Sequence, residues 1–120
     1  MNVYQMGTIE ARFADIVWQN EPITSTELCK IAFDEFGWKK STTYTVLKRL
    51  CEKGILKNEN GTVCSLISKE EFYSHQSDRF VSENFGGSLP AFIAAFTAKN
   101  NLTLEQINEI KAMINKFEEE

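Results

Sequence analysis

The segment from Trp38 to Lys57, WKKSTTYTVLKRLCEKGILK, combines positive charge with small hydroxyl side chains. It carries six Lys/Arg and one Asp/Glu, a net charge of +5, whereas the whole chain carries −4. Lysine and arginine neutralise phosphates and release condensed counterions. Serine and threonine bond phosphate oxygens or base edges without blocking close approach. These residue types in this density are suited to binding nucleic acid.

The apolar spacing in this segment predicts a helix that begins near Ser41, a residue type that often caps helix N-termini. One side of the helix collects Thr43, Val46, Leu47, Leu50 and Gly54 and is expected to pack inward. The opposite side and the lysines before it supply the candidate DNA-binding residues, which are Lys39, Lys40, Ser41, Thr42, Tyr44, Thr45, Lys48 and Arg49.

These candidates divide into two expected roles. Lys39, Lys40 and Lys48 would anchor phosphates, while Thr42, Thr45 and Arg49 would support or carry sequence discrimination. Tyr44 lies at the margin, where it either touches a thymine methyl or a phosphate, or closes the edge of the core. The alternative for the whole set is a solvated helix face with ordinary lysines.

The elements before and after this helix would hold it in place. A helix is expected over Thr8–Gln19, and a second runs from a T-x-x-E capping box at Thr24 to a glycine, Gly37, that ends it. Two strands, Ile55–Lys57 and Thr62–Ile67, flank Asn60-Gly61, a typical tight hairpin turn. Three helices followed by a hairpin is the order of a winged helix-turn-helix, which is also used by plain protein-interaction modules.

The rest of the chain is predicted to be helical throughout. Helices are expected over Lys69–Phe85 and Leu89–Ala98, and a last one follows a capping box formed by Thr103 and Gln106. The expected fold is therefore mainly α. Residues 1–70 would form a winged helix-turn-helix DNA-binding domain, and residues 71–120 a helical dimerisation domain.

These C-terminal helices hold more apolar side chains than about 50 residues can bury alone. Residues 69–120 also carry five Lys/Arg against nine Asp/Glu, while the charges of residues 1–68 cancel. A second copy of the chain would cover the excess apolar surface; the alternative is that the helices fold back on the N-terminal domain. The candidate dimerisation residues are Phe80, Phe85, Phe92, Ile93, Phe96, Ile110, Ile114 and Phe117.

Several other classes of protein are disfavoured. Three widely spaced cysteines and one histidine argue against a zinc site or a disulfide framework, so no metal or cofactor is expected. No catalytic set can be proposed from the residue spacing, and we expect no enzyme activity. The sequence shows no secretory signal and no apolar run that could span a bilayer, so a cytoplasmic location is expected.

The chain resembles the penicillinase and methicillin-resistance repressors, the BlaI/MecI-type family, from about Met6 to Phe117. The carriers of the resemblance are ADIVW with the following PIT, GWKKSTTYTVLKRLCEKGIL, SLISKEEFY and FGGSLPAFIAAF. The resemblance implies a winged-helix domain that binds DNA, followed by helices that intertwine two subunits. Such a homodimer would bind a palindromic operator in double-stranded DNA and block transcription.

Three positions depart from the family pattern. Lactam-responsive members are cut at an Asn-Phe bond after a sensor protease is triggered, and the corresponding pair here is Ala95-Phe96. Copper-responsive members carry C-terminal cysteines, whereas no cysteine follows Cys64 here. The expected wing, NENGTVCS, lacks the basic residue and aromatics often found there. The resemblance therefore leaves any upstream sensor protein and the inducing signal unidentified.

The resulting hypothesis is a homodimeric transcriptional repressor with its recognition helix, at about residues 41–53, in the major groove. The alternative is a protein-interaction module of the anti-repressor type that keeps a winged-helix fold without binding an operator.

Overall fold

The computed structural model describes residues 6–119 and divides into two compact units, one ending at Asp78 and one beginning at Arg79. The sequence boundary was placed earlier, between residues 70 and 71. The division falls inside a helix, α4 (Lys69–Phe85), whose first half belongs to the first unit.

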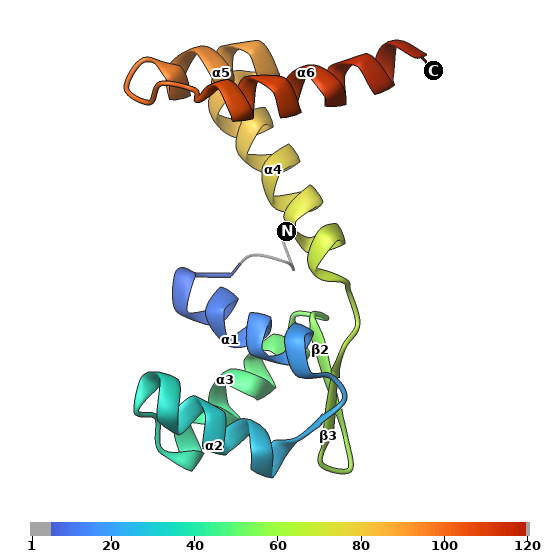
Figure 1. Cartoon of the computed structure of the whole chain (residues 1–120). Coiled ribbons are helices and arrows are strands. Elements are labelled where there is room, and N and C mark those ends of the chain that lie inside the picture. Colours follow the sequence, from blue (N-terminus) through green and yellow to red (C-terminus); the bar gives the residue numbers. More distant parts are fainter. Residues whose placement is uncertain (1–5, 120) are drawn as a thin grey trace. The chain divides into compact units, whose positions relative to one another are not determined.

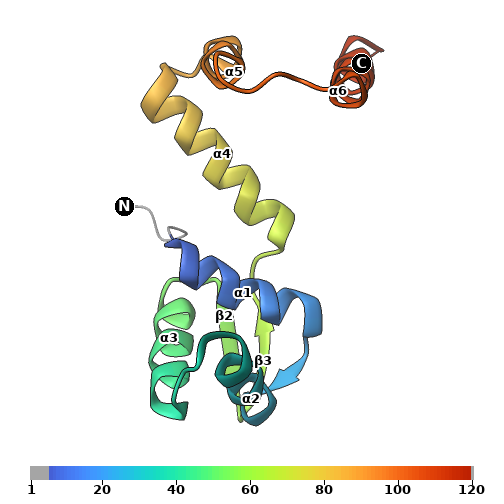
Figure 2. The ribbon, with the colours of Figure 1, turned by 60° about the vertical axis from the view of Figure 1, so that its left-hand side comes forward.

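The described part of the first unit contains three helices, a small sheet and the first half of α4, and the three helices with the sheet are as expected for a winged helix (Figure 1). The three strands form an antiparallel sheet in the order β1-β3-β2, with Ile23 opposite Val63 and Leu56 opposite Ser65. Helix α3 packs against β2, and α1 packs against β3 (Figure 2). The bounds of these elements are α1 Thr8–Asn20, β1 Ile23–Thr24, α2 Ser25–Phe36, α3 Lys40–Glu52, β2 Leu56–Glu59 and β3 Thr62–Ser65.

A single apolar core joins these elements, and every helix of the unit contributes to it. Phe13 of α1, Leu28 of α2 and Leu50 of α3 are fully buried, as is Phe72 at the start of α4. The indole of Trp18 packs on Phe72 and donates a hydrogen bond from Nε1 to the Ile67 carbonyl at 3.0 Å. The first turns of α4 are therefore fixed to the winged-helix unit.

Local capping signals were predicted well. The Thr24 hydroxyl accepts a hydrogen bond from the Glu27 N–H, and Gly37 ends α2 with a left-handed φ of 70°. In the C-terminal unit, Thr103 and Gln106 form the reciprocal capping box. The hairpin turn is also confirmed, since Asn60 and Gly61 both have positive φ.

Other local predictions were wrong. The N-cap of α3 is Lys39, and Ser41 lies at the second helical position, because the Lys39 carbonyl already accepts from the Thr43 N–H. The second strand of the hairpin ends at Ser65 rather than at residue 67, and the first extends to Glu59. Strand β1 was not predicted, because its two residues are extended only through pairing with β3.

The C-terminal unit contains the end of α4 together with α5 (Leu89–Thr97) and α6 (Leu104–Glu119). Ser88 caps α5 by accepting a hydrogen bond from the Ala91 N–H. Neither α5 nor α6 has a buried residue. Among the described residues, no helix is both long enough and apolar enough to cross a membrane.

Candidate nucleic-acid interface

The start of α3 is fixed by the link that joins it to α2. Gly37 reverses the chain, and its N–H donates to the Phe33 carbonyl at 2.8 Å. Trp38 then folds back onto the core, with its ring centroid 4.6 Å from that of Phe36 and 5.7 Å from that of Phe13. This aromatic contact sets the position from which Lys39 and α3 begin.

One side of α3 is buried, and the candidate DNA-binding residues lie mainly on the other. The buried side consists of Thr43, Val46, Leu47 and Leu50, as the periodicity predicted, whereas Gly54, also expected on this side, follows the end of α3 and is half-buried. The candidates with exposed side chains are Lys39, Lys40, Ser41, Thr42, Thr45, Lys48 and Arg49.

Tyr44 differs from the other candidates. Its side chain is half-buried against the core, and its hydroxyl donates to Ser25 Oγ at 3.0 Å. Ser25 in turn donates its backbone N–H to the Gly61 carbonyl at the hairpin turn. Tyr44 thus links α3 to the N-terminus of α2 and to the wing.

The six cations of the segment fall into two groups. Arg49 and Lys53 pair with Glu10, and Lys57 pairs with Glu59 at 3.0 Å. Lys39, Lys40 and Lys48 form no ion pair with any residue that the structure describes. These three lysines, which we call the unpaired lysines, lie around the N-terminal half and outer face of α3, beside the exposed hydroxyls. A phosphate reaching this surface would find cations that the fold has not neutralised.

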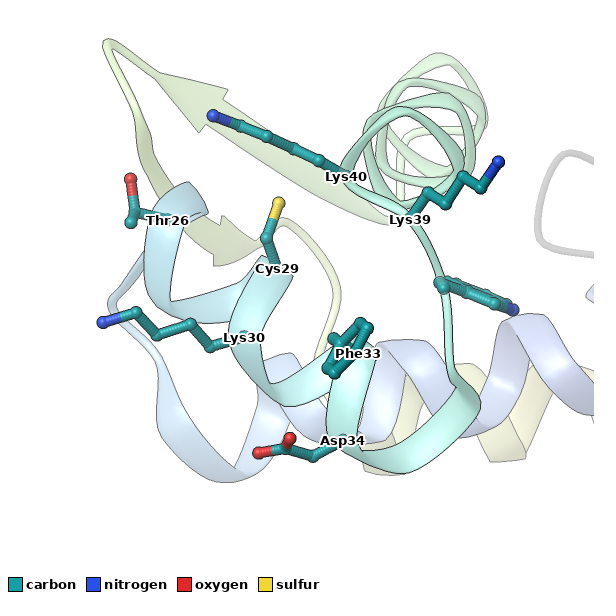
Figure 3. A pocket seen from close by; sticks show the side chains of 8 residues that line it. Thr26, Cys29, Lys30, Phe33, Asp34, Lys39 and Lys40 are labelled. Atoms are coloured by element: carbon teal, nitrogen blue, oxygen red, sulfur yellow. The ribbon is translucent and has the colours of Figure 1, made fainter.

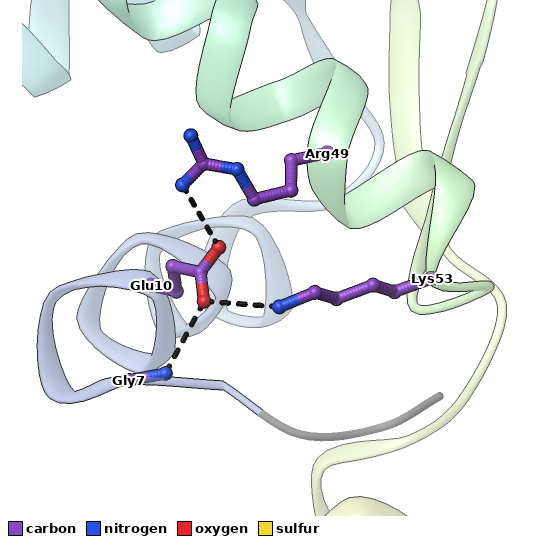
Figure 4. Close-up of polar contacts among 4 residues, drawn as sticks. All are labelled: Gly7, Glu10, Arg49 and Lys53. Atoms are coloured by element: carbon purple, nitrogen blue, oxygen red, sulfur yellow. Dashed lines mark hydrogen bonds and ion pairs between the residues drawn. The ribbon is translucent and has the colours of Figure 1, made fainter. Parts of the chain in front are cut away.

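Glu10 holds the C-terminal end of α3 to the N-terminal end of α1 (Figure 4). Its Oε2 lies 3.3 Å from Arg49 Nη1, and its Oε1 lies 3.2 Å from Lys53 Nζ and accepts the Gly7 N–H at 3.2 Å. Burial alone would raise the pKa of the Glu10 carboxyl. The hydrogen bonds from Gly7, Lys53 and Arg49 outweigh burial, so the pKa lies below its ordinary value.

Sequence reasoning missed Glu10. It lies 39 residues from Arg49 and 43 from Lys53, and nothing in its local pattern indicates either partner. The position of Glu10, three residues after Gly7, indicates only the start of a helix. The pairing arises because the core brings α1 and α3 together.

The wing contributes little free positive charge. Lys57 is paired with Glu59, an interaction that raises the pKa of Lys57, and Glu21 accepts hydrogen bonds from the Ser65 N–H and hydroxyl. The turn is closed by the Gly61 N–H, which donates to Asn58 Oδ1 at 3.0 Å. The cationic surface of this unit is therefore centred on α3.

The candidate dimerisation residues share an aromatic cluster and a largely exposed apolar surface. The rings of Phe80, Phe85 and Phe92 contact one another at centroid distances of 5.6 to 6.0 Å, and Phe96 contacts Phe92 at 6.3 Å. Large fractions of several side chains stay exposed, from 41% for Ile93 to 77% for Phe117. The exposed members are Phe80, Ile93, Phe96, Ile114 and Phe117, and the half-buried ones are Phe85, Phe92 and Ile110.

A family model described as penicillinase repressor matches residues 6–116, almost the whole chain. The chain belongs to the penicillinase repressor family. It is 24% identical over 116 residues to the penicillinase repressor of Bacillus licheniformis, covering 93% of this chain and 91% of the relative. It is 20% identical over 117 residues to the methicillin resistance regulatory proteins MecI of Staphylococcus aureus strain Mu50 and of Mammaliicoccus sciuri, covering 94% of this chain and 95% of each relative.

Membership of the penicillinase repressor family makes this chain a transcriptional regulator of the BlaI/MecI type, and it confirms the resemblance inferred from the sequence motifs. The relatives are named as repressors and regulatory proteins rather than as enzymes. Among residues 6–119 of this penicillinase repressor family member, no group of three or more His, Cys, Asp or Glu side chains is arranged to hold a metal ion.

Replacing Glu10 by Gln tests the contact that holds α3 to α1. Because the folded pKa of Glu10 is lowered, its carboxylate stabilises the fold above the ordinary glutamate pKa, and this stabilisation is lost as the pH falls through the folded pKa. Arg49 is half exposed, so solvent screens the pair. We expect Glu10→Gln to lower the free energy of unfolding by about 1 kcal/mol at neutral pH.

Urea titrations followed by the fluorescence of Trp18 and Trp38 report on this unit directly, because both indoles pack in its core. Glu59→Gln is the matched control, since Glu59 is 70% exposed and pairs only with Lys57 among the described residues. The difference in the free energy of unfolding between Glu10→Gln and the unchanged chain should vanish in acid, where the Glu10 carboxyl is protonated. If the two free energies of unfolding differ by the same amount at all pH values, the stabilisation does not come from the Glu10 carboxylate.

Proposed function

We propose that this chain is a DNA-binding repressor that works in the cytoplasm as a homodimer on a palindromic operator. The observation that carries the proposal is the set of unpaired lysines beside the exposed hydroxyls of α3. The acidic groups of the first unit neutralise Arg49, Lys53 and Lys57 but leave Lys39, Lys40 and Lys48 available. A negative net charge of the chain does not oppose this, because a duplex responds to the local field.

The proposed complex places α3 in the major groove. The second helix of a helix-turn-helix enters that groove with its N-terminal residues toward the bases. Ser41, Thr42 and Thr45 are exposed in the N-terminal half of α3, while Lys39 and Lys40 stand at its start and Lys48 further along its outer face. In this arrangement the hydroxyls meet base edges and the lysines meet phosphates on either side.

Arg49 has a divided role in this proposal. Its Nη1 binds Glu10, but its side chain is 52% exposed and a guanidinium carries five N–H donors. The remaining donors can contact DNA while the pair with Glu10 fixes the direction of the side chain. Thr45 is similarly oriented, since its hydroxyl donates to the Ser41 carbonyl at 2.9 Å and still has lone pairs to accept a bond.

Replacing Lys48 by Ala tests the phosphate contact. Binding to duplex DNA should weaken across all sequences, and the slope of log affinity against log salt should flatten by about 1. Fluorescence anisotropy over a salt series measures both quantities. The matched control is Lys111→Ala, a lysine of α6 in the C-terminal unit. Equal slopes for Lys48→Ala and the unchanged protein would remove Lys48 from the phosphate contacts.

The dimer proposal is supported by the exposed apolar surface of the C-terminal unit. Soluble monomers rarely expose large contiguous apolar patches. Ile93, Phe96 and Met113 line one groove of about 360 Å³ between α5 and α6, and Ile114 and Phe117 extend the apolar side of α6. A second copy of the chain would cover this surface with an identical one, since closed symmetric pairs are the commonest oligomers.

Replacing Phe96 by Glu should disrupt this interface. Phe96 is 47% exposed, so the substitution leaves the fold of the single chain largely intact but introduces a charge into the proposed contact. Sedimentation equilibrium should show a dimer for the unchanged protein and a monomer for Phe96→Glu. Phe33→Glu, at an exposed ring of the first unit, is the control and should stay dimeric. If Phe96→Glu is as dimeric as the control, the C-terminal unit does not form the interface.

A further inference from the structure

A groove of about 740 Å³ lies between α2 and the start of α3, and the proposed function does not account for its shape (Figure 3). The lining comes from both helices and from the link between them. The lining includes Thr26, Cys29, Lys30, Phe33, Trp38 and Lys40. Grooves that bind small organic molecules commonly have volumes of this order.

The floor of the groove is apolar and unusually exposed. Phe33 leaves 64% of its surface in water, although the neighbouring Ala32 is fully buried in the core. Trp38 is held by its contacts with Phe13 and Phe36, so its position is fixed. Cys29 lies one helical turn before Phe33 and is half-buried. Together these side chains offer a preformed apolar contact that no described part of the protein covers.

The rim of the groove is positively charged. Lys30, Lys39 and Lys40 line it together with a single acidic residue, Asp34, a net charge of +2. None of the three lysines forms an ion pair within residues 6–119. Figure 3 shows the ammonium groups of Lys30 and Lys40 extending to the side of the groove where Thr26 lies, with Phe33 further along α2. The Lys39 side chain extends to the opposite side. Two of the three ammonium groups and the Thr26 hydroxyl are thus on one side of the groove, and the aromatic ring of Phe33 lies beyond them.

We propose that this groove binds a small organic anion with an apolar body, of which an aromatic carboxylate is the simplest member. The carboxylate would accept hydrogen bonds from Lys30, Lys40 and the Thr26 hydroxyl, while the ring covers Phe33. A cation would meet a net positive rim, and an uncharged apolar molecule would leave the lysines unused. A DNA duplex supplies the charge, but its bases are stacked on one another and leave no planar face for the Phe33 ring.

Because the groove lies at the start of α3, a ligand bound there would affect DNA binding. Lys39 and Lys40 line the groove and are also two of the three unpaired lysines assigned above to phosphates. If the proposed function holds, ligand and duplex compete for the ammonium group of Lys40, the one lysine assigned to both. The ligand would then lower the affinity for DNA without acting on the C-terminal unit, which is the behaviour of an inducer.

The binding test uses naphthoate and naphthylmethylammonium, two probes with the same ring system and opposite charge. Each is titrated into the full chain labelled with ¹⁵N, and amide chemical shifts are followed. Naphthoate should shift the amides of Thr26, Lys30, Phe33 and Lys40 saturably, and the ammonium probe should not. Equal shifts with both probes, or naphthoate shifts confined to α5 and α6, would overturn the proposal.

Two substitutions sharpen the test, and both are at exposed positions, so the fold is kept. Phe33→Ser and Lys40→Gln should each weaken naphthoate binding about fivefold or more. Phe117→Ser and Lys116→Gln, at exposed positions of α6, are the matched controls and should leave naphthoate affinity unchanged. Loss of affinity in the controls but not in the groove variants would place the ligand elsewhere.

The competition test separates this inference from the proposed function. Naphthoate should release labelled duplex from the unchanged protein but should be less effective with Phe33→Ser, a residue not assigned to DNA. A protein that binds naphthoate in the groove but no duplex would sustain the site and reject the repressor mechanism. A protein that binds duplex but shows no amide shifts in the groove with naphthoate would sustain the proposed function and reject the groove site.

Discussion

The burial of one side of α3 is the constraint from which the rest of the first unit follows. Val46, Leu47 and Leu50 pack into the core with Phe13 and Leu28. Burying a side chain of this size contributes roughly 1.5–3 kcal/mol. A rotation of α3 by one residue, about 100°, would exchange part of this apolar side for threonines and lysines. The fold therefore fixes which polar side chains face outward before any ligand is present.

Charge pairing then distinguishes the two ends of α3. At the C-terminal end, Glu10 neutralises Arg49 and Lys53, and Arg49 also lies in the last turn, where a cation interacts favourably with the helix dipole. At the N-terminal end, Lys39 and Lys40 have no acidic neighbour in the first turn. Lysines without an ion-pair partner among the described residues consequently stand at the end of α3 where the α2–α3 groove opens. One arrangement of charges can therefore serve both a duplex and a small anion.

The sequence predicted those features that depend on neighbours within a few residues. The Thr24 side-chain cap, the capping box at Thr103, the Gly37 helix end and the Asn60-Gly61 turn are all local, and all were found. Of the capping box predicted at Thr24, the structure shows the bond from the Glu27 N–H to the Thr24 hydroxyl. The sides of α3 followed from its 3.6-residue period. The winged-helix class followed from the order of the elements.

Features that depend on distant partners could not be predicted in this way. Strand β1 exists because Ile23 pairs with Val63, and the Arg49 geometry depends on Glu10. The assignment of Ser41 as the cap of α3 failed because the helix begins two residues earlier than that cap requires, with Lys39 as an N-cap that makes no side-chain capping bond. Tyr44 had two open roles until the position of Ser25 was known.

The central claim is that the polar side of α3 lies in the major groove of a duplex, with one copy of the helix on each half of an inverted repeat. Selection of random duplex DNA by the purified full-length protein tests it most directly. The account predicts enrichment of an inverted repeat with half-site centres separated by about one helical turn, ~10 bp, or a multiple of it. It also predicts that replacing Thr42 and Thr45 together by Ala relaxes the preference within each half-site. A selected pool without any shared repeat, from protein that is folded and dimeric, would contradict the account.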